Sequence, residues 1–212
     1  MEASTCNPRY HDASSFRLIA SNSLSFYHLN VCSLRNKEDE VKIFLSSLNH
    51  EFDVLAFSET WFSGISDVVQ FEGYRCEAVY RTNWRGGGVA VYIMNNFVYE
   101  VISDFTVINP SFESLFVKTS SFVFGVIYRP PSGLLDEFYR FLEQVLESAS
   151  VLRMPVVIMG DININLLQPS HLVDEFIDIL SSNGFSNVID APTRVTDSSE
   201  TLIDLRLTSC DK

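Results

Sequence analysis

The sequence predicts a single α/β domain, and three observations support this fold class. The 212 residues are 46% hydrophobic and 13% aromatic, which is enough for one substantial core. A continuous apolar run at 155–159 is typical of a strand that is buried on both faces. Apolar residues at helical spacing, near 36–48, 132–146 and 170–183, alternate with further strand-like segments. We therefore expect residues 24–212 to form the domain, preceded by a loose N-terminal arm at 1–23.

Charge and composition exclude several classes of protein. A formal net charge of −12 argues against a generic nucleic-acid-binding protein, which normally carries a basic face. It does not exclude an enzyme that binds phosphate through a divalent metal, because such a metal needs clustered carboxylates. The sequence has no run of about 18 apolar residues, so no membrane span is expected, and its N-terminus lacks the apolar core of a secretory signal. The four cysteines are scattered without a CxxC pair, which favours reduced thiols over disulfides or a zinc site.

The first two predicted strands both end on a polar residue. The strand at 24–31 alternates in polarity and ends near Asn30, and His28 on the same face is expected to be a packed structural histidine. Asn36 offers an N-cap for the helix that follows. The second strand, 53–59, is an apolar run ending on Glu59. A salt bridge at the sheet rim would explain Glu59, but beside the other polar strand ends metal ligation is the better interpretation.

A glycine run lies within the next segment, 73–107, which is expected to form short antiparallel strands. Gly86, Gly87 and Gly88 permit tight backbone geometry or the close approach of a ligand. The run lacks the GxGxxG or GxxxxGK spacing of a nucleotide-binding loop. Arg85, beside it, is a candidate phosphate contact.

Polar residues also follow the strands of the second half. A hairpin ending near 128 is stopped by a proline pair, which leaves Tyr128 and Arg129 at its tip. The apolar strand at 155–160 delivers Asp161 and Asn163 at its C-terminal end. Asp161 could serve only to cap the following turn, as Asp and Asn often do. Asp204 interrupts an otherwise apolar strand at 201–208, so it needs a partner if it is buried.

These strand ends together supply an oxygen-rich set of side chains. Carboxylate and amide oxygens suit a hard cation, Mg²⁺ or alternatively Mn²⁺, better than zinc. Such a cation would neutralise a phosphate oxygen and the leaving oxyanion, so phosphodiester hydrolysis is the natural reaction class. No Gly-x-Ser-x-Gly elbow competes with this interpretation. The set comprises Asn30, Glu59, Tyr128, Asp161, Asn163 and Asp204.

Five short motifs occur in an order that resembles the endonuclease/exonuclease/phosphatase superfamily. Within it, the chain looks most like the endonuclease domain of non-LTR (LINE-type) retrotransposon polyproteins, over roughly residues 24–209. The resemblance implies a DNase I-like, four-layer α/β-sandwich of two facing mixed β-sheets flanked by helices. The motifs are His-Leu-Asn-Val at 28–31, Ser-Glu-Thr-Trp at 58–61, Ile-Tyr-Arg-Pro-Pro at 127–131, Gly-Asp-Ile-Asn at 160–163 and Leu-Ile-Asp at 202–204.

The resemblance also implies a role for each motif residue. Glu59 would be the principal Mg²⁺ ligand with help from Asn30, Asp161 would activate water, and Asn163 would hold the scissile phosphate. Tyr128 would contact that phosphate or the leaving group, and Asp204 would orient a catalytic histidine. Further substrate contacts are expected from Arg85, Arg129, Thr193 and Arg194. By the same resemblance we expect a DNA substrate, a reverse-transcriptase domain in the intact element, no membrane association, and an intracellular, nuclear location.

The catalytic histidine of the resembled family is the one part without a match. It belongs to a Ser-Asp-His motif on a strand after the Asp204 position, and this sequence contains no such motif. We therefore expect either a fragment or truncated copy of a longer element, or an impaired domain, with the strand at 201–208 left as an unpaired edge. The alternatives are another superfamily hydrolase, such as an abasic-site nuclease or a phosphoinositide or sphingomyelin phosphodiesterase, or a non-catalytic scaffold. The four histidines, none of which fits the motif, are His11, His28, His50 and His171.

Overall fold

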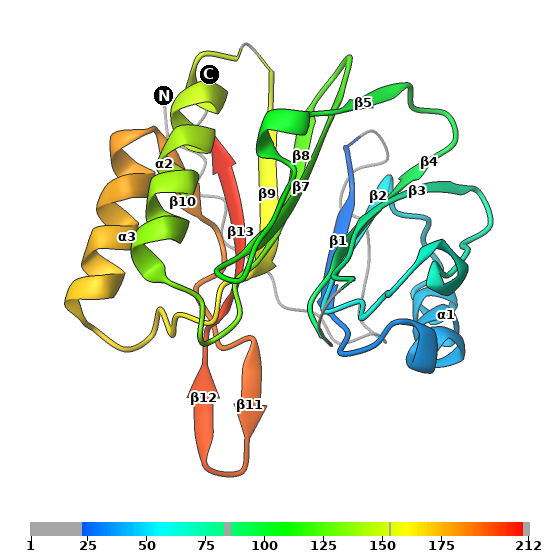
Figure 1. The fold of residues 1–212 in the computed structure, drawn as a ribbon, viewed down its shortest axis with the longest axis horizontal. Helices are drawn as coiled ribbons and strands as arrows, with labels where there is room; N and C mark the ends of the chain where they lie inside the picture. Colours follow the sequence, from blue (N-terminus) through cyan, green and yellow to red (C-terminus); the bar gives the residue numbers. More distant parts are fainter. Residues whose placement is uncertain (1–22, 83–85, 153, 210–212) are drawn as a thin grey trace.

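Two β-sheets pack face to face, with helices on their outer sides (Figure 1). The computed structural model describes residues 23–82, 86–152 and 154–209. The expected arm at 1–23 therefore lies almost entirely outside the described residues. The smaller sheet has the order β1-β2-β4-β3, with β1 parallel to β2 and the other pairs antiparallel. Its strands are β1 (Phe26–Asn30), β2 (Val54–Ser58), β3 (Tyr74–Val79) and β4 (Val89–Met94).

The larger sheet has seven strands in the order β10-β13-β9-β8-β7-β5, and β6 also pairs with β7. Only β8 and β9 are parallel in it. Its strands are β5 (Tyr99–Val101), β6 (Val107–Ile108), β7 (Glu113–Thr119), β8 (Val123–Tyr128), β9 (Val156–Asp161), β10 (Phe185–Asn187) and β13 (Asp204–Ser209). A separate hairpin of β11 (Arg194–Thr196) and β12 (Ser199–Thr201) projects from one end of the molecule (Figure 1).

The helices complete a four-layer sandwich, as the sequence predicts. The helix α1 (Glu38–Ser47) covers the smaller sheet, and α2 (Leu135–Ser150) and α3 (His171–Ser182) cover the larger one (Figure 1). Short 3-10 helices occupy Arg35–Lys37, Ile65–Asp67 and Ser103–Phe105. The expected cap at Asn36 is wrong, because that residue lies inside the first 3-10 helix and Lys37 stands at the N-cap of α1.

The strand pattern determines which side chains fill each layer. Residues of β1 alternate between two cores: Phe26 stacks on Phe124 of the facing sheet at 5.4 Å between ring centroids, while Tyr27 packs on the α1 side. The central layer between the sheets is filled by apolar side chains of β2, β4, β7 and β8. Because apolar burial of this kind dominates folding stability, the facing sheets form a rigid frame for residues at the strand ends.

The strand that begins at Asp204 is not an edge, which corrects the expectation from sequence. In the larger sheet β13 pairs with β9 on one side and β10 on the other. Among the described residues, the edges of the smaller sheet are β1, which pairs with β2, and β3, which pairs with β4. The sequence could not show which strands are edges, because strand order depends on backbone pairing between segments far apart in the chain. In the described part of the chain, no helix has the length and apolar character needed to cross a bilayer.

Gly160 allows the close approach of β8 and β9 immediately before Asp161. It pairs with Ile127, and a Cβ at this position would overlap the Ile127 carbonyl oxygen. We predict that Gly160→Ala lowers the free energy of unfolding by about 3 kcal/mol, because the obstructing atom is backbone and cannot rotate away. Urea unfolding checks this against Gly64→Ala, where the nearest atom to an added Cβ lies at 4.0 Å. Equal stability of the two variants would contradict the argument.

Candidate active site

Strand direction brings the polar strand ends to one end of the sandwich. Because β1 and β2 are parallel, Asn30 and the residue after Ser58, Glu59, lie at the same edge of the smaller sheet. In the larger sheet Tyr128 and Asp161 are partners on parallel strands, and Asp204 at the start of β13 is directly opposite Asp161. Since the sheets face each other, these groups meet across the central layer.

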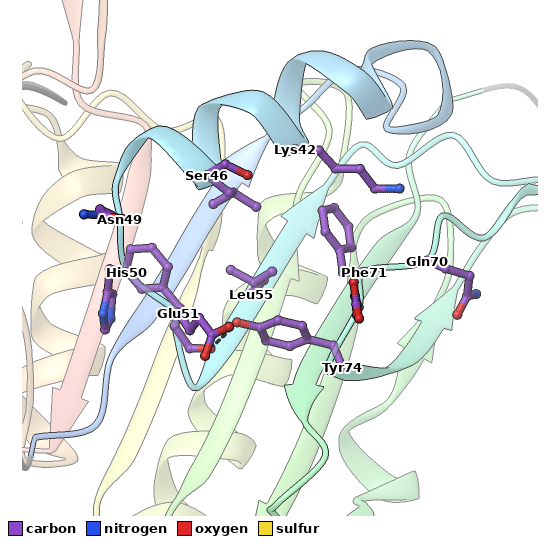
Figure 2. A pocket seen from close by; sticks show the side chains of 12 residues that line it. Lys42, Ser46, Asn49, His50, Glu51, Leu55, Gln70, Phe71 and Tyr74 are labelled. Carbon is purple, nitrogen blue, oxygen red and sulfur yellow. Dashed lines mark hydrogen bonds between the residues drawn. The ribbon is translucent and has the colours of Figure 1, made fainter.

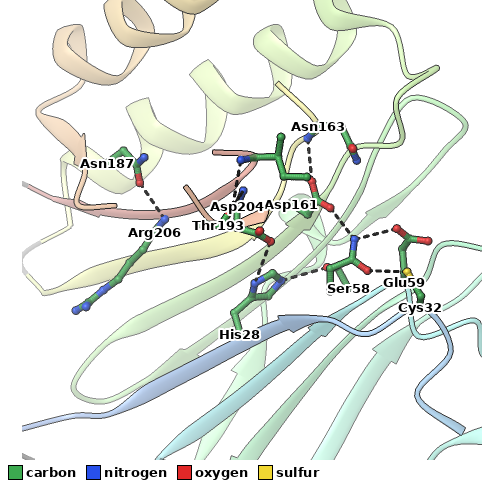
Figure 3. A network of polar contacts seen from close by, with 12 residues as sticks. His28, Cys32, Ser58, Glu59, Asp161, Asn163, Asn187, Thr193, Asp204 and Arg206 are labelled. Carbon is green, nitrogen blue, oxygen red and sulfur yellow. Dashed lines mark hydrogen bonds and ion pairs between the residues drawn. The ribbon is translucent and has the colours of Figure 1, made fainter. Parts of the chain in front are cut away.

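The amide of Asn30 joins the two carboxylates that the sequence singled out. Its Nδ2 donates to Glu59 Oε1 at 2.9 Å and to Asp161 Oδ2 at 2.6 Å. Asp161 Oδ1 in turn accepts the backbone N–H of Asn163 at 2.9 Å. Figure 3 shows Glu59 and Asp161 pointing toward each other from opposite sheets. The predicted residues Asn30, Glu59 and Asp161 are therefore in one cluster, although their roles remain predictions.

Asp161 is a carboxylate in a poor environment for negative charge. Its side chain is buried, and its pKa is raised to about 6, chiefly by this burial and also by the negative charges of Asp204 and Glu59. The hydrogen bonds from Asn30 and from the Asn163 backbone oppose these effects. Within residues 23–82, 86–152 and 154–209, no lysine, arginine or histidine forms an ion pair with Asp161 or Glu59. Among the described residues, the two carboxylates therefore converge with no cationic side chain within ion-pair distance of either.

This donor set fits a hard divalent cation. Both carboxylates lie within hydrogen-bond distance of one Asn30 nitrogen, so their oxygens face a common position. Among the described residues, no three His, Cys, Asp or Glu side chains gather at metal-binding distances. That is compatible with Mg²⁺, which usually keeps several waters and binds through one or two carboxylates plus substrate phosphate oxygens. Glu59 and Asp161 are the groups that would hold it. The Asn30 amide oxygen would join them only after rotation of the amide, because Nδ2 now faces the carboxylates and Oδ1 accepts from the Cys32 thiol.

Tyr128 lies beside the carboxylate pair and retains its proton. Burial raises the pKa of its phenol well above the usual range, and the negative charges of Glu59 and Asp161 raise it further. A phenol in this setting is a hydrogen-bond donor at all ordinary pH values. It is paired with Asp161 on the neighbouring strand, and its role in the site remains a prediction.

Asp204 faces His28 from the neighbouring sheet. The His28 Nδ1 lies 3.9 Å from Asp204 Oδ1, and its Nε2 lies 3.2 Å from the Ser58 hydroxyl. Burial lowers the pKa of His28 to about 4, so the ring is neutral at pH 7. Its side chain is only 4% exposed, as expected for a packed histidine, and is too buried to reach a substrate. Burial raises the pKa of Asp204, and a hydrogen bond with Thr193 opposes this.

Two residues of the cluster were not predicted from the sequence. The Cys32 thiol donates to Asn30 Oδ1 at 3.4 Å, and Trp61 Nε1 donates to Glu59 Oε2 at 3.3 Å. Burial and the charge of Glu59 raise the pKa of Cys32. Each lies two residues from a predicted site residue, so proximity in sequence was the available signal. Both have positive φ, 45° for Cys32 and 57° for Trp61, which side-chain patterns do not reveal.

The Arg129 side chain, predicted to contact substrate, instead donates hydrogen bonds to backbone carbonyls. Its Nε donates to the Ile162 carbonyl at 2.7 Å, while Nη1 and Nη2 donate to the carbonyls of Gly133 and Asn163 at 2.7 and 2.9 Å. The residue is 4% exposed. Asn163 returns the contact, since its Nδ2 donates to the Arg129 carbonyl at 2.9 Å. Arg129 therefore fixes the loop after Asp161, because its donors are already committed to buried carbonyls.

The other predicted substrate contacts lie toward the projecting hairpin or outside the described residues. Thr193 Oγ1 accepts the backbone N–H groups of Ile203 and Asp204 at 3.3 and 3.2 Å, which ties the base of the hairpin to β13. Arg194 is exposed at the start of β11. Arg85 falls outside the described residues. Their contacts with substrate remain predictions.

A pocket at α1, drawn in Figure 2, is lined by none of the residues of this cluster. It has a volume of about 920 Å³ and opens between α1 and the far end of β2, with Leu55 and Tyr74 in its wall. Its rim carries both signs of charge, including Lys42 and Glu51. This mixture gives no basis for phosphate chemistry there, so the convergent carboxylates and not the pocket volume identify the site.

A model of the endonuclease/exonuclease/phosphatase family matches residues 27–206. The chain belongs to this family. Family members are generally metal-dependent phosphodiesterases, nucleases and phosphatases, and the carboxylate cluster of this family member is compatible with that chemistry. No curated protein sequence matches the chain significantly.

Solved structures share the family fold at low sequence identity. The endonuclease domain of TRAS1, a telomere-specific non-LTR retrotransposon, has a TM-score of 0.65 and 10% identity over 88% of this chain and 85% of that one. The 3′ phosphatase NExo from Neisseria, bound to a product DNA hairpin, has a TM-score of 0.63 and 13% identity over 88% of this chain and 87% of that one. The AP endonuclease LMAP from Leishmania major has a TM-score of 0.62 and 12% identity over 88% of this chain and 79% of that one. These likenesses establish the DNase I-like fold.

The ionisation of Asp161 predicts how stability changes with pH in the metal-free protein. Its folded pKa of about 6 lies above the ordinary value of 3.8, so the folded state binds more protons between these values. Stability therefore falls as pH rises from 4 to 7, by about 2–3 kcal/mol. We predict that urea unfolding of Asp161→Asn lacks this loss, whereas the control Asp197→Asn, in the exposed hairpin turn, retains it. Parallel pH profiles for all three proteins would contradict the assignment.

The buried guanidinium predicts a stability effect that a substrate contact would not have. Lysine cannot direct donors to three separated carbonyls, so Arg129→Lys leaves buried acceptors unsatisfied. We predict a loss of about 2–4 kcal/mol in the free energy of unfolding without any ligand. If Arg129→Lys leaves the free energy of unfolding unchanged and weakens substrate binding, Arg129 is a substrate contact, as the sequence predicted. Arg140→Lys on the exposed face of α2 serves as control.

Proposed function

We propose that this chain is a Mg²⁺-dependent DNA endonuclease domain that nicks a target strand to prime reverse transcription. The observation that carries the proposal is the convergence of Glu59 and Asp161 on the Asn30 amide from facing sheets, with no cationic side chain of the described residues in an ion pair with either. When bound there, Mg²⁺ would neutralise the charge that develops on the phosphate and leaving oxygens. Mn²⁺ would be accepted by the same donor set.

Asp161, Tyr128 and Asn163 supply the other groups that the hydrolysis needs. The Asp161 carboxylate would orient a water and accept its proton as the general base. The protonated Tyr128 phenol donates a hydrogen bond to the phosphate or the leaving oxygen. Asn163 uses one N–H of its amide for the Arg129 carbonyl, and we assign the second to the scissile phosphate. Priming needs a free 3′-hydroxyl, so water attacks phosphorus, the bond to O3′ breaks, and the phosphate remains on the 5′ end.

Two considerations favour a DNA-nicking role over other family activities. The order of the motifs around Asn30, Glu59 and Tyr128 resembles the retrotransposon branch. A retrotransposon endonuclease is among the proteins that share the fold. The net charge of −12 opposes the approach of a polyanion, and a bound cation would offset part of that repulsion. Action in the nucleus, beside a reverse-transcriptase domain, belongs to the same proposal.

The proposal predicts metal-dependent nicking of supercoiled plasmid. Removing either converging carboxylate should lower the nicking rate about 10²–10³-fold or more, because charge stabilisation in the transition state is lost. The variants are Glu59→Gln and Asp161→Asn, assayed with Mg²⁺ and with excess EDTA. Glu72→Gln, at the distant pocket of Figure 2, is the matched control and should cut like the parent protein.

Equal cutting by parent and carboxylate variants would refute the assigned roles. A second arm supplies DNA with a 3′-phosphate, DNA with an abasic site, and a phosphoinositide. Turnover of one of these without plasmid nicking would move the chain to another branch of the family. Absence of turnover and of Mg²⁺ binding in a folded protein would support the non-catalytic scaffold.

A further inference from the structure

The turn that carries Glu59 is held by the glycine run of another segment. The backbone N–H of Thr60 donates to the Gly88 carbonyl at 3.1 Å, and that of Trp61 donates to the Gly87 carbonyl at 2.9 Å. Glu59 and Trp61 have φ of 54° and 57°, a region that non-glycine residues rarely adopt. Such a turn persists only where its surroundings enforce it. The position of the Glu59 carboxylate therefore depends on the backbone at 87–88.

That backbone is fixed by a buried ion pair. The Glu113 carboxylate accepts the Gly88 N–H through Oε2 and the Arg81 Nε–H through Oε1. Glu113 is fully buried and the Arg81 side chain is 10% exposed. A Cβ on Gly88 would lie 2.5 Å from Thr60 Oγ1, and one on Gly87 would overlap Glu113 and Arg81. The glycines are therefore required for the ion pair and the Glu59 turn to come this close.

A general contribution to stability does not explain this ion pair. Removing two charges from water is costly, and well-packed apolar residues often stabilise a core as much as a buried pair does. A charged acceptor, however, makes a stronger and more directional bond to a backbone N–H than a neutral one. Glu113 on β7 is opposite Tyr128 of β8, which in turn is paired with Asp161 of β9, and Arg81 follows β3 of the smaller sheet.

We propose that Glu113 is a positioning residue for Glu59: with Arg81 it fixes Gly87 and Gly88, and these fix the turn from Glu59 to Trp61. The inference rests on the proposed function of Glu59 as a cation ligand. Outer residues that orient metal ligands commonly change metal affinity 10–100-fold when altered. Glu113 itself touches neither substrate nor the reacting atoms in this scheme.

Hydrogen–deuterium exchange of the metal-free protein tests the positioning directly. In Glu113→Gln, the amides of Thr60 and Trp61 should exchange about tenfold faster, because one weakened hydrogen bond loosens the turn. Two controls should leave these amides unchanged. Glu100→Gln removes an exposed ion pair with Lys118, which lies on β7 as Glu113 does. Val117→Ala removes a buried side chain of β7 and leaves a cavity in the core beside that strand.

Mg²⁺ titration by calorimetry supplies the second readout. The dissociation constant should rise 10–100-fold in Glu113→Gln and stay within about twofold in both controls. If Val117→Ala weakens Mg²⁺ binding as much as Glu113→Gln, the effect is general destabilisation and the positioning role is overturned. Unchanged exchange at Thr60 and Trp61 in Glu113→Gln also overturns it.

The two readouts separate this inference from the proposed function. If the parent protein binds no Mg²⁺ but Glu113→Gln still accelerates exchange at Thr60 and Trp61, the proposed function fails while the structural coupling stands. Should Glu113→Gln not fold because Arg81 is left as an unpaired buried charge, the double variant Arg81→Gln with Glu113→Gln removes that charge. It should fold and show the same faster exchange; protection equal to that of the parent protein would overturn the inference.

Discussion

One amide group connects the two sheets at the point where the chemistry is proposed. Asn30, at the end of β1, donates to Glu59 of its own sheet and to Asp161 of the facing sheet. Apolar side chains fill most of the layer between the sheets, where His28 with Asp204 and Arg81 with Glu113 are further polar contacts. The cluster can remain polar because it lies at the ends of strands, where burial of a core face is not required. Placement of both carboxylates thus depends on the packing of two whole sheets.

Around this contact, the structure uses buried polar groups to fix loops that side-chain packing alone would leave free. Arg129 fixes the loop after Asp161 through three carbonyls, and Glu113 fixes the glycine run beside the Glu59 turn. Each has its donors or acceptors satisfied, as buried polar groups require. The turns that carry the cation ligands in the two sheets are therefore supported by one buried glutamate on β7 and one buried arginine directly after β8, both from the larger sheet.

The sequence indicated that Asn30, Glu59 and Asp161 lie together, but it did not indicate that Arg129 and Glu113 fix the loops around them. Apolar runs that end on Asn30, Glu59 and Asp161 mark strand ends, and parallel neighbours bring such ends together. Whether Arg129 points outward or folds back onto carbonyls depends on the turn that follows, which the proline pair alone does not specify. Glu113 lies in a strand, and its partners are 25 and 32 residues away. Only the chain's three-dimensional packing brings such residues together.

The most direct test of the account is the position of a bound Mn²⁺ in a crystal of this protein. Anomalous diffraction locates the ion without assumptions about activity. The account predicts one peak between the Glu59 and Asp161 carboxylates, at roughly 2.0–2.2 Å from a Glu59 oxygen, the distance typical of small divalent cations. A fully occupied ion elsewhere, with Asn30 still bridging the two carboxylates, would contradict it.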